Sequence, residues 1–381
     1  MGTAVCHPEE TAHEVEEFAE DWQVLLTHLP EGWEAQAREK KALQRARSFE
    51  SAEALLRTLL IHLAEGCSLR ETAVRASEGG VASVSDVAVF KRLRASEEWL
   101  RWLALKLANN DDQTGIPDGE GRLRIRIVDA TVVREPGSTG GDWRLHYALC
   151  LKTLQCDHFE LTDIHGGESL SRFPISVDDV ILADRFYGTP KHVRHVVNHG
   201  GHVIIRLRAK GHCLRKPDGE PFELLRMLRR VKSGDIREWP VSMVAKGGQS
   251  IPGRLCAVKR SNMATKLAQK KMRVDFGRDG RTPSKQNLQI ARYVFLFTTI
   301  PSSILAAPEV LELYRARWQI ETCFKRLKSI MGFGHLPKHD PQSCRAWLYG
   351  KLVVALLAER LVDSAQRFSP WGYPFRSIIP E

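Results

Sequence analysis

The chain has 381 residues, which is long enough for two or three structural units with a large buried core. Its formal net charge of +10 and its isoelectric point near 9.3 favour a polyanionic partner, because Lys and Arg release counterions when they neutralise phosphates. The acidic start HPEETAHEVEEFAEDW excludes a secretory signal, and the apolar stretch LVVALLAERLV is too short to span a bilayer. We therefore expect a cytoplasmic protein.

The cysteines are scattered and form no CxxC pair, so we expect reduced thiols rather than a disulfide framework. There are eight of them: Cys6, Cys67, Cys150, Cys156, Cys213, Cys256, Cys323 and Cys344. His146, Cys150, Cys156 and His158 match no common zinc spacing.

The first third of the chain has a helical pattern, with amphipathic runs from Val15 to about Leu107. Within it, SLRETAVRASEGGVASVSDVAVFKRLR resembles a helix-turn-helix, with a break at its two glycines. Lys91, Arg92 and Arg94 on the second helix suit phosphates or base edges. A plain helical bundle is the alternative interpretation. The following stretch, NNDDQTGIPDGEGR, has the composition of a linker.

After the linker the period of the pattern changes from helix to strand. In LRIRIVDATVV, from Leu123 to Val133, apolar residues alternate with arginines, which predicts a strand. Asp129 continues the apolar face of this strand. A carboxylate in that position is unfavourable unless it is paired or binds a cation.

A second aspartate ends another predicted strand. After two partner strands, RLHYALCLKT and HFELTDIHG, the apolar run 180–183 leads to Asp184, and Thr189 and Pro190 then open a helix. Open α/β sheets bind ligands where a buried strand ends before a helix. The alternative is that Asp184 only caps the helix or forms the turn. Asp178 and Asp179, before the strand, are interpreted as turn residues.

The segment HVIIRLRAK continues the predicted sheet, and ARYVFLFTTI later restores it. Between them, from about Gly211 to Gln286, we expect an inserted, mostly β unit with a basic surface. A flexible solvated loop is the alternative interpretation of this unit, whose last part, TKLAQKKMRVDFGRDGRTPSKQ, is rich in cations. Trp239 is a candidate for stacking on a base, although a structural aromatic is the simpler interpretation.

The segment YRARWQIETCFKRLK, from Tyr314 to Lys328, contains no Pro or Gly and predicts one helix. At about 100° per residue, four apolar residues form a stripe that faces a core: Leu313, Ile320, Phe324 and Leu327. Four polar residues form a second stripe, roughly 60° wide, along its edge: Tyr314, Arg317, Glu321 and Lys328. A solvated face with i,i+4 ion pairs is the alternative interpretation.

Taken together, Asp129, Asp184 and Glu321 predict a metal site at one end of a mixed sheet flanked by helices. Phosphodiester chemistry needs an activated oxygen nucleophile and a stabilised leaving oxygen, and two divalent ions about 3.5–4 Å apart supply both. Mg²⁺ prefers carboxylate oxygens. Arg317 and Lys328 then suit the phosphates on either side of the reacting one, and Tyr314 can hydrogen-bond to the backbone of the nucleic acid.

These residues carry a resemblance to a known family. The spacing Y-x2-R-x3-E-x6-K, with VDATVV around Asp129 and ADRFYG around Asp184, resembles the DDE insertion-sequence transposases of family four, the YREK group. The resemblance covers roughly Leu123 to Leu361. It implies a ribonuclease H-like core with a β-rich insertion, and cut-and-paste transposition by a dimer that bridges two DNA ends. It implies that Asp129, Asp184 and Glu321 are catalytic and bind Mg²⁺, for which Mn²⁺ can substitute.

The resemblance also implies that Tyr314, Arg317 and Lys328 bind DNA, including the terminal inverted repeats and the target.

We expect a helical DNA-binding domain over residues 1–115 and the first part of the catalytic core over 116–210. The insertion is expected over 211–290, and the rest of the core with C-terminal helices over 291–381. Two alternatives remain open, namely a non-catalytic DNA-binding derivative or repressor of transposition, and a ribonuclease H-like nuclease.

Overall fold

The computed structural model describes residues 22–44, 49–108, 123–135, 137–138, 141–208, 214–244, 249–334, 336–337 and 339–367. The predicted linker lies outside these residues. The chain divides into two compact units. The first comprises Met1–Gln113, Val132–Arg144 and Phe324–Glu381, and the second comprises Thr114–Thr131 and Leu145–Cys323. None of the described helices is both long and apolar enough to cross a membrane.

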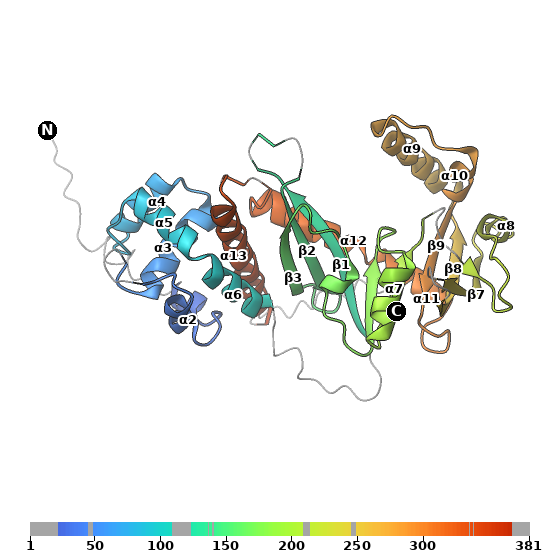
Figure 1. The fold of residues 1–381 in the computed structure, drawn as a ribbon, viewed down its shortest axis with the longest axis horizontal. Coiled ribbons are helices and arrows are strands. Elements are labelled where there is room, and N and C mark those ends of the chain that lie inside the picture. Colours follow the sequence, from blue (N-terminus) through green and yellow to red (C-terminus); the bar gives the residue numbers. More distant parts are fainter. Residues whose placement is uncertain are drawn as a thin grey trace. The chain divides into compact units, whose positions relative to one another are not determined.

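The first unit is built mostly from helices (Figure 1). They are α2 (Trp33–Glu39), α3 (Ala52–Glu65), α4 (Leu69–Glu78), α5 (Asp86–Ala95), α6 (Glu97–Ala108) and α13 (Pro341–Arg367). The C-terminal helix α13 packs against α6, α3 and α5, which lie far from it in the sequence. Leu352, Val353 and Leu356 of α13 are buried in this contact region together with apolar residues of α3 and α6. The sequence pattern did not predict this pairing of the two ends of the chain.

Helices α4 and α5 form the predicted helix-turn-helix pattern. Ser68 and Ser85 cap them by accepting hydrogen bonds from backbone amides three residues ahead, and Gly80 adopts a positive φ in the connection. Two of the three α5 cations that the sequence suggested for nucleic-acid binding make contacts within the protein. Arg92 donates to a backbone carbonyl oxygen and Arg94 donates to Gln342, both within the first unit. Of the three, Lys91 is the cation with no such contact to a described residue.

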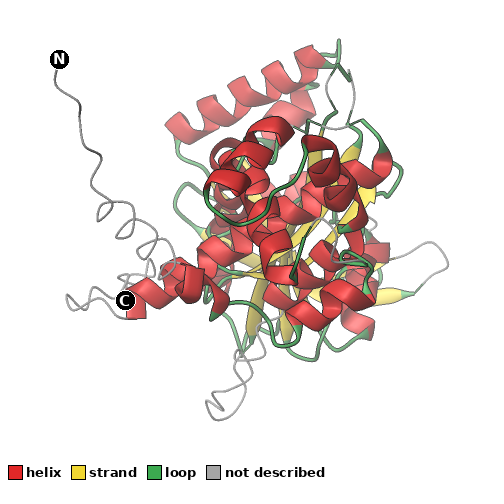
Figure 2. Cartoon of the chain, turned by 90° about the vertical axis from the view of Figure 1, so that its left-hand side faces the viewer, coloured by secondary structure: helices red, strands yellow, loops and turns green. Residues whose placement is uncertain are grey.

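The second unit contains most of a nine-stranded sheet, drawn in yellow in Figure 2, whose order is β3-β2-β1-β4-β5-β9-β8-β7-β6. The strands that the sequence predicts before the insertion are β1 (Arg124–Val133), β2 (Trp143–Cys150), β3 (Cys156–Asp163), β4 (Asp179–Ala183) and β5 (His202–Arg206). Strands β1, β4 and β5 are parallel to one another. All five residues of β4 are buried, as expected for a strand covered on both faces. The predicted mixed α/β sheet flanked by helices is therefore confirmed.

The remaining strands extend the same sheet. They are β6 (Leu214–Arg215), β7 (Ile236–Val244), β8 (Ser250–Lys259) and β9 (Tyr293–Thr298), and all of them are paired in antiparallel fashion. Strand β9 joins this group to β5, so the strands of the predicted insertion continue the same sheet. Trp239 of β7 packs against the core and contacts the ring of Phe222 edge to face, which supports its structural interpretation.

The remaining helices of the second unit are α7 (Pro190–Asn198), α8 (Leu224–Leu228), α9 (Asn262–Arg278), α10 (Lys285–Ile290), α11 (Ala307–Arg315) and α12 (Trp318–Lys325). Helix α12 extends past Cys323, where the second unit ends. Helix α7 begins with Pro190 at its first position, as predicted, and packs against β5 and β8. Most of the cation-rich segment after β8 is the 17-residue helix α9, so the flexible-loop interpretation is wrong for this part of the insertion.

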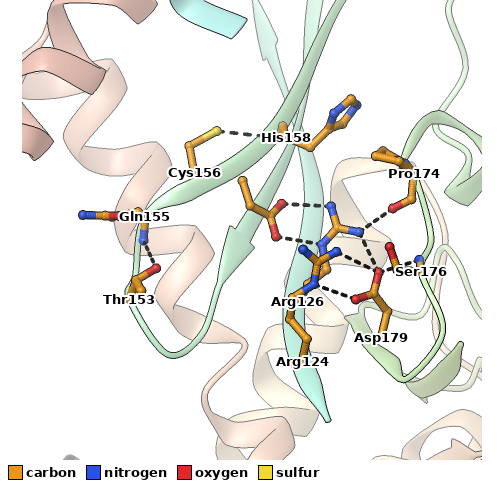
Figure 3. Close-up of polar contacts among 10 residues, drawn as sticks. Arg124, Arg126, Thr153, Gln155, Cys156, His158, Pro174, Ser176 and Asp179 are labelled. Atoms are coloured by element: carbon orange, nitrogen blue, oxygen red, sulfur yellow. Dashed lines mark hydrogen bonds and ion pairs between the residues drawn. The ribbon is translucent and has the colours of Figure 1, made fainter. Parts of the chain in front are cut away.

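A buried ion-pair network holds β1 against the start of β4 (Figure 3). Arg126 is 1% exposed and makes two hydrogen bonds, of 2.7 and 2.9 Å, to the carboxylate of Asp157. It also donates to Asp179 at 3.1 Å and to the backbone oxygen of Pro174. A buried guanidinium with this many partners is satisfied, and it fixes the position of β1 beside β4.

Asp179 was interpreted as a turn residue, and this is wrong. It is the first residue of β4, 1% exposed, and it accepts two hydrogen bonds from Arg124 in addition to that from Arg126. Burial alone would raise the pKa of Asp179, but the hydrogen bonds from Arg124 and from the amide of Ser176, with the charge of Arg126, outweigh burial and lower it. Asp178, in contrast, has a positive φ typical of a turn.

Candidate active site

Strand register brings the first two predicted carboxylates side by side. In the parallel pairing of β1 and β4, Arg124 is opposite Asp179 and Ile127 is opposite Leu182. The same register carried forward sets Asp129 opposite Asp184. Side chains opposite each other on parallel neighbours point to the same face, and such strands lie about 4.8 Å apart. Asp129, within β1, and Asp184, directly after β4, therefore lie side by side at the carboxyl end of β4.

The charged form of the Asp129 carboxylate is destabilised by its surroundings. Burial raises the pKa of Asp129 to about 6, and the charge of Asp184 adds to this effect. A hydrogen bond from the amide of Ala130 and the charge of Arg317 act in the opposite direction. Nearby Glu168 contributes a further negative charge. The raised pKa means that this position favours an additional cation close to Asp129.

Asp184 is held by the turn that follows β4. One carboxylate oxygen accepts a hydrogen bond of 2.6 Å from the amide of Phe186, two residues further on. An aspartate commonly shapes a turn through this local hydrogen bond. Asp184 is therefore a turn residue, as the alternative interpretation stated, and this does not exclude a second role for its carboxylate. The next residues pack tightly, because Tyr187 is fully buried and a Cβ on Gly188 would lie 2.9 Å from the carbonyl oxygen of Arg206. The turn therefore fixes where Asp184 emerges from the sheet.

Arg317 links the first strand to the predicted glutamate. Its guanidinium lies 3.7 Å from a carboxylate oxygen of Asp129 and forms a hydrogen-bonded ion pair with Glu321. The side chain of Arg317 is 19% exposed, whereas that of Glu321 is 61% exposed. Burial raises the pKa of Tyr314 to about 12, although the charges of Arg317 and Arg206 oppose this. Four of the six predicted site residues, Asp129, Tyr314, Arg317 and Glu321, thus interact around one guanidinium.

The predicted single helix from Tyr314 to Lys328 is wrong in detail. Helix α11 ends at Arg315 and α12 begins at Trp318, with hydrogen bonds spanning three residues around Ala316 and Arg317. The segment Arg326–Ile330 is a π-helical turn. The predicted stripe of four polar residues therefore does not continue to Lys328.

Lys328 lies on this π-helical turn, within the part of the chain assigned to the first unit. Burial lowers the pKa of Lys328, and the neighbouring charge of Arg134 lowers it further. The half-buried Lys328 and the exposed Arg134 repel each other, and a phosphate between them would relieve that repulsion. The predicted apolar stripe is correct for Ile320, Phe324 and Leu327, which are buried.

Sequence reasoning missed Arg206, the last residue of β5. The register of β4 and β5 pairs Ala183 with Ile205, so that Arg206 follows opposite Asp184. Burial lowers the pKa of Arg206, and the charges of Tyr314 and Asp184 favour its protonated form. The sequence could have predicted that Arg206 lies near Asp184, because Arg206 ends the next predicted strand and the ends of neighbouring parallel strands meet at one edge of a sheet.

The carboxylates have the donor chemistry that Mg²⁺ prefers, since all three provide hard oxygen ligands. Asp129 and Asp184 lie side by side at the carboxyl end of β4, and burial of Asp129 favours a cation there. Within the described ranges, no three His, Cys, Asp or Glu side chains are gathered as a metal-binding group. The structure therefore brings together two of the three predicted ligands and leaves Glu321 joined to them through Arg317.

The substitution Asp129→Asn is expected to stabilise the chain in buffer free of divalent ions. An unfolded Asp has a pKa of about 3.9, so the folded chain binds the extra proton between about pH 4 and 6 and its stability falls as the pH rises through that window. Asn removes this loss, which raises the free energy of unfolding by about 2 kcal/mol at about pH 8 and by little at about pH 3. Urea unfolding at the two pH values measures the difference. A variant that is less stable than the parent at about pH 8 would contradict the buried-charge argument.

Comparison with known proteins shows the family to which the chain belongs. The family model described as transposase DDE domain matches residues 120–357. The chain is 33% identical over 359 residues to InsL of the insertion sequence element IS186A from Escherichia coli (strain K12), covering 92% of this chain and 96% of that one. It is also 33% identical over 360 residues to the transposase for the insertion sequence element IS421 from Escherichia coli, with the same coverage.

More distant relatives include the transposase for the insertion sequence element IS231F from Bacillus thuringiensis subsp. israelensis. The identity is 24% over 271 residues, which covers 61% of this chain and 55% of that one. Among solved structures, a piggyBac transposase synaptic complex with hairpin DNA matches with a TM-score of 0.44 and 11% identity, covering 93% of this chain and 74% of the other. The family match and the 33% identity over nearly the whole chain establish that the protein belongs to the DDE transposases of insertion sequences.

Proposed function

We propose that this transposase binds the terminal inverted repeats of an insertion sequence, cleaves the DNA at those ends and joins them to target DNA by a cut-and-paste route. The observation that carries the proposal is the strand register that aligns Asp129 with Asp184, with Arg317 connecting Asp129 to Glu321. A ribonuclease H-like core is the fold that we infer for this part of the chain. Its parallel strands β1, β4 and β5 support that inference.

In this proposal Asp129, Asp184 and Glu321 hold two Mg²⁺ ions, and Mn²⁺ can substitute. Bound Mg²⁺ would activate a water or hydroxyl nucleophile and stabilise the leaving oxygen of the phosphodiester. The protein's own residues position the DNA strand. Arg317 contacts a phosphate through the guanidinium that otherwise pairs with the acids. Tyr314 donates a hydrogen bond from its phenol hydroxyl, which is protonated at neutral pH and whose pKa is raised further by burial.

The partners that we propose are the two DNA ends, the target DNA and a second copy of the chain in a cytoplasmic complex. The net charge of +10 supports binding to DNA. A dimer would let each subunit act on one end while both ends are held together.

The test is incubation of the pure protein with Mg²⁺ and a duplex carrying the inverted repeats that border its gene. Cleavage at the repeat ends followed by joining to a second DNA supports the proposal. Nicking without joining would instead indicate a nuclease, and binding without cleavage would indicate a non-catalytic derivative or repressor. Either of these two results would overturn the proposal.

Lys328→Ala is expected to weaken binding to the terminal repeat because it removes one phosphate contact. We expect an affinity lower by roughly 5-fold to 10-fold and a plot of log affinity against log salt that is shallower by about 1. The matched control is Lys325→Ala. Lys325 lies three residues earlier in the chain, and it is exposed to solvent. Gel-shift titrations at several salt concentrations measure both variants. An unchanged salt slope for Lys328→Ala would contradict its role.

A further inference from the structure

Helix α9, Asn262–Arg278, is a long helix of which no residue is buried. It lies beside α10 in the excursion of the chain between β8 and β9 (Figure 1). At about 100° per residue, its partly covered side chains fall within one arc, which includes Gln269, Met272 and Phe276. The opposite side of the helix is exposed to solvent over its whole length.

This exposed side is strongly basic. It carries five exposed cations and no acid: Lys266, Lys270, Lys271, Arg273 and Arg278. None of the five forms an ion pair with a described residue. By helical geometry they form two rows about 100–120° apart, with Lys266, Lys270 and Arg273 in one row and Lys271 and Arg278 in the other. The positive charge is therefore divided along the two margins of the exposed side.

An apolar strip lies between the two rows. Met263 is 75% exposed, Leu267 is 60% exposed and Val274 is 48% exposed. Side chains of this size are usually covered when they occur together on one side of a helix. The exposed side of α9 thus has a central apolar strip bordered by cations on both margins.

Helix α9 is anchored firmly enough to present this surface. Ser261 caps its first turn by accepting a hydrogen bond from the amide of Ala264. Gln269 donates a 2.8 Å hydrogen bond to the backbone oxygen of Leu288 in α10. Strands β8 and β9, which lead into and out of the excursion, are paired with each other as far as Lys259 and Tyr293.

We propose that α9 binds duplex DNA by lying in the major groove, with its two rows of cations on the two phosphate backbones and its apolar strip against the base edges. This inference rests on the proposed function for the presence of DNA, and adds a contact surface separate from the acidic site. The major groove is about 12 Å wide and admits one α-helix. A helix in that position has phosphates along both margins and bases in front, which matches the three zones of α9.

The base contact that fits the strip is the methyl group of thymine. Met263, Leu267 and Val274 have no hydrogen-bonding groups, so they cannot read the donors and acceptors of the groove. They can pack against the C5 methyl group of thymine, which is the apolar feature of the major groove. The helix should therefore favour thymine-containing steps over the same steps without the methyl group.

The comparison with α5 favours α9 as a duplex-binding helix. On α5, Arg92 and Arg94 are engaged by groups of their own unit, whereas the five cations of α9 point to solvent. An anionic membrane surface is the other polyanion that a basic amphipathic helix suits. Because the chain belongs to a family of transposases, whose substrate is DNA, duplex DNA is the polyanion that we propose for this surface.

The first experiment uses the full chain carrying Lys266→Ala, Lys270→Ala and Arg273→Ala together. Alanine preserves helix propensity, so the helix should persist. We expect at least 10-fold weaker binding to a mixed-sequence duplex and a salt slope shallower by about 2.7, because three phosphate contacts are lost. Circular dichroism checks that the helix content is unchanged.

The matched control removes the same charge from another exposed part of the second unit, through Lys216→Ala, Arg230→Ala and Lys232→Ala. Its binding should change less than 2-fold. An equal loss in both triple variants would show that only the total charge matters, and would overturn the inference. Unchanged DNA binding of the α9 variant, with lost binding to phosphatidylglycerol vesicles, would assign the surface to a membrane instead.

The second experiment tests the apolar strip by replacing thymine with deoxyuracil in the same duplex. The parent chain should bind the methyl-free duplex several-fold more weakly. A variant carrying Met263→Ser, Leu267→Ser and Val274→Ser should bind the two duplexes equally. If the parent does not distinguish them, α9 does not lie with its strip in the groove. A parent that fails to bind any duplex would instead overturn the proposed function itself.

Discussion

Glu321→Gln is expected to abolish DNA cleavage while leaving DNA binding within about 2-fold of the parent. The substitution keeps the shape of the side chain but removes the negative charge that we assign to Mg²⁺ binding. A loss of several kcal/mol of transition-state stabilisation corresponds to a cleavage rate lower by roughly 10³-fold. Because Glu321 is 61% exposed, its ion pair with Arg317 adds little to stability and the variant should fold normally.

The matched control is Glu312→Gln in α11. Glu312 is also an exposed glutamate paired with an arginine, Arg315, at 2.9 Å, but it lies outside the proposed site. Single-turnover cleavage and gel-shift assays on both variants separate catalysis from binding. A loss of binding by Glu321→Gln as large as its loss of cleavage would contradict the assignment of Glu321 as a metal ligand.

Arg126→Met is expected to be the most destabilising single change in the sheet. It leaves the carboxylate of Asp157 buried without its two hydrogen bonds and removes one partner of Asp179. Removing one member of a buried ion pair costs about 3–5 kcal/mol, since the remaining charge has no compensation. Urea unfolding near neutral pH measures this loss as a lower free energy of unfolding.

Arg124→Met provides the control on the same strand. Arg124 also pairs with Asp179, but its side chain is 49% exposed, so screening by water should limit the loss to about 1 kcal/mol. The pH dependence gives a second check. The lowered pKa of Asp179 means that its contribution is present above about pH 4 and is lost at lower pH. The deficit of Arg126→Met should therefore shrink in acid, and a constant deficit would contradict its electrostatic origin.

The sequence was sufficient to place Asp129 in a strand and Asp184 directly after another, because both positions depend on local patterns. Alternation in β1 placed Asp129 on the apolar face, and the apolar run of β4 placed Asp184 at its carboxyl end. Alternation could not show that Arg126 is buried. The charge of Arg126 is neutralised by Asp157 of β3, and a pattern within β1 alone cannot predict a partner on another strand.

The break between α11 and α12 also depends on distant contacts. No Pro or Gly marks it, and helix propensity favours an uninterrupted helix from Tyr314 onward. The interruption falls at Arg317, whose half-buried guanidinium pairs with Asp129 of β1 as well as with Glu321. Helix propensity alone therefore did not predict this interruption. Lys328 leaves the predicted stripe because the segment Arg326–Ile330 is a π-helical turn.

The nature of the cation-rich segment was ambiguous for a different reason. Its charges are typical both of a solvated loop and of an exposed helix, and its apolar residues are too few to predict a buried face. The capping serine Ser261 and the absence of Pro from 262–278 were the available signals for α9.

The antiparallel pairing of β8 with β9 has a consequence for how this protein can change over time. The chain leaves the sheet after Lys259 and returns at Tyr293, directly across from its point of departure. A tight hairpin turn would bridge the same two positions. The length and charge of the segment between them can therefore change without breaking the hydrogen-bonded ladder, so this segment can diverge while the sheet that carries Asp129 is kept.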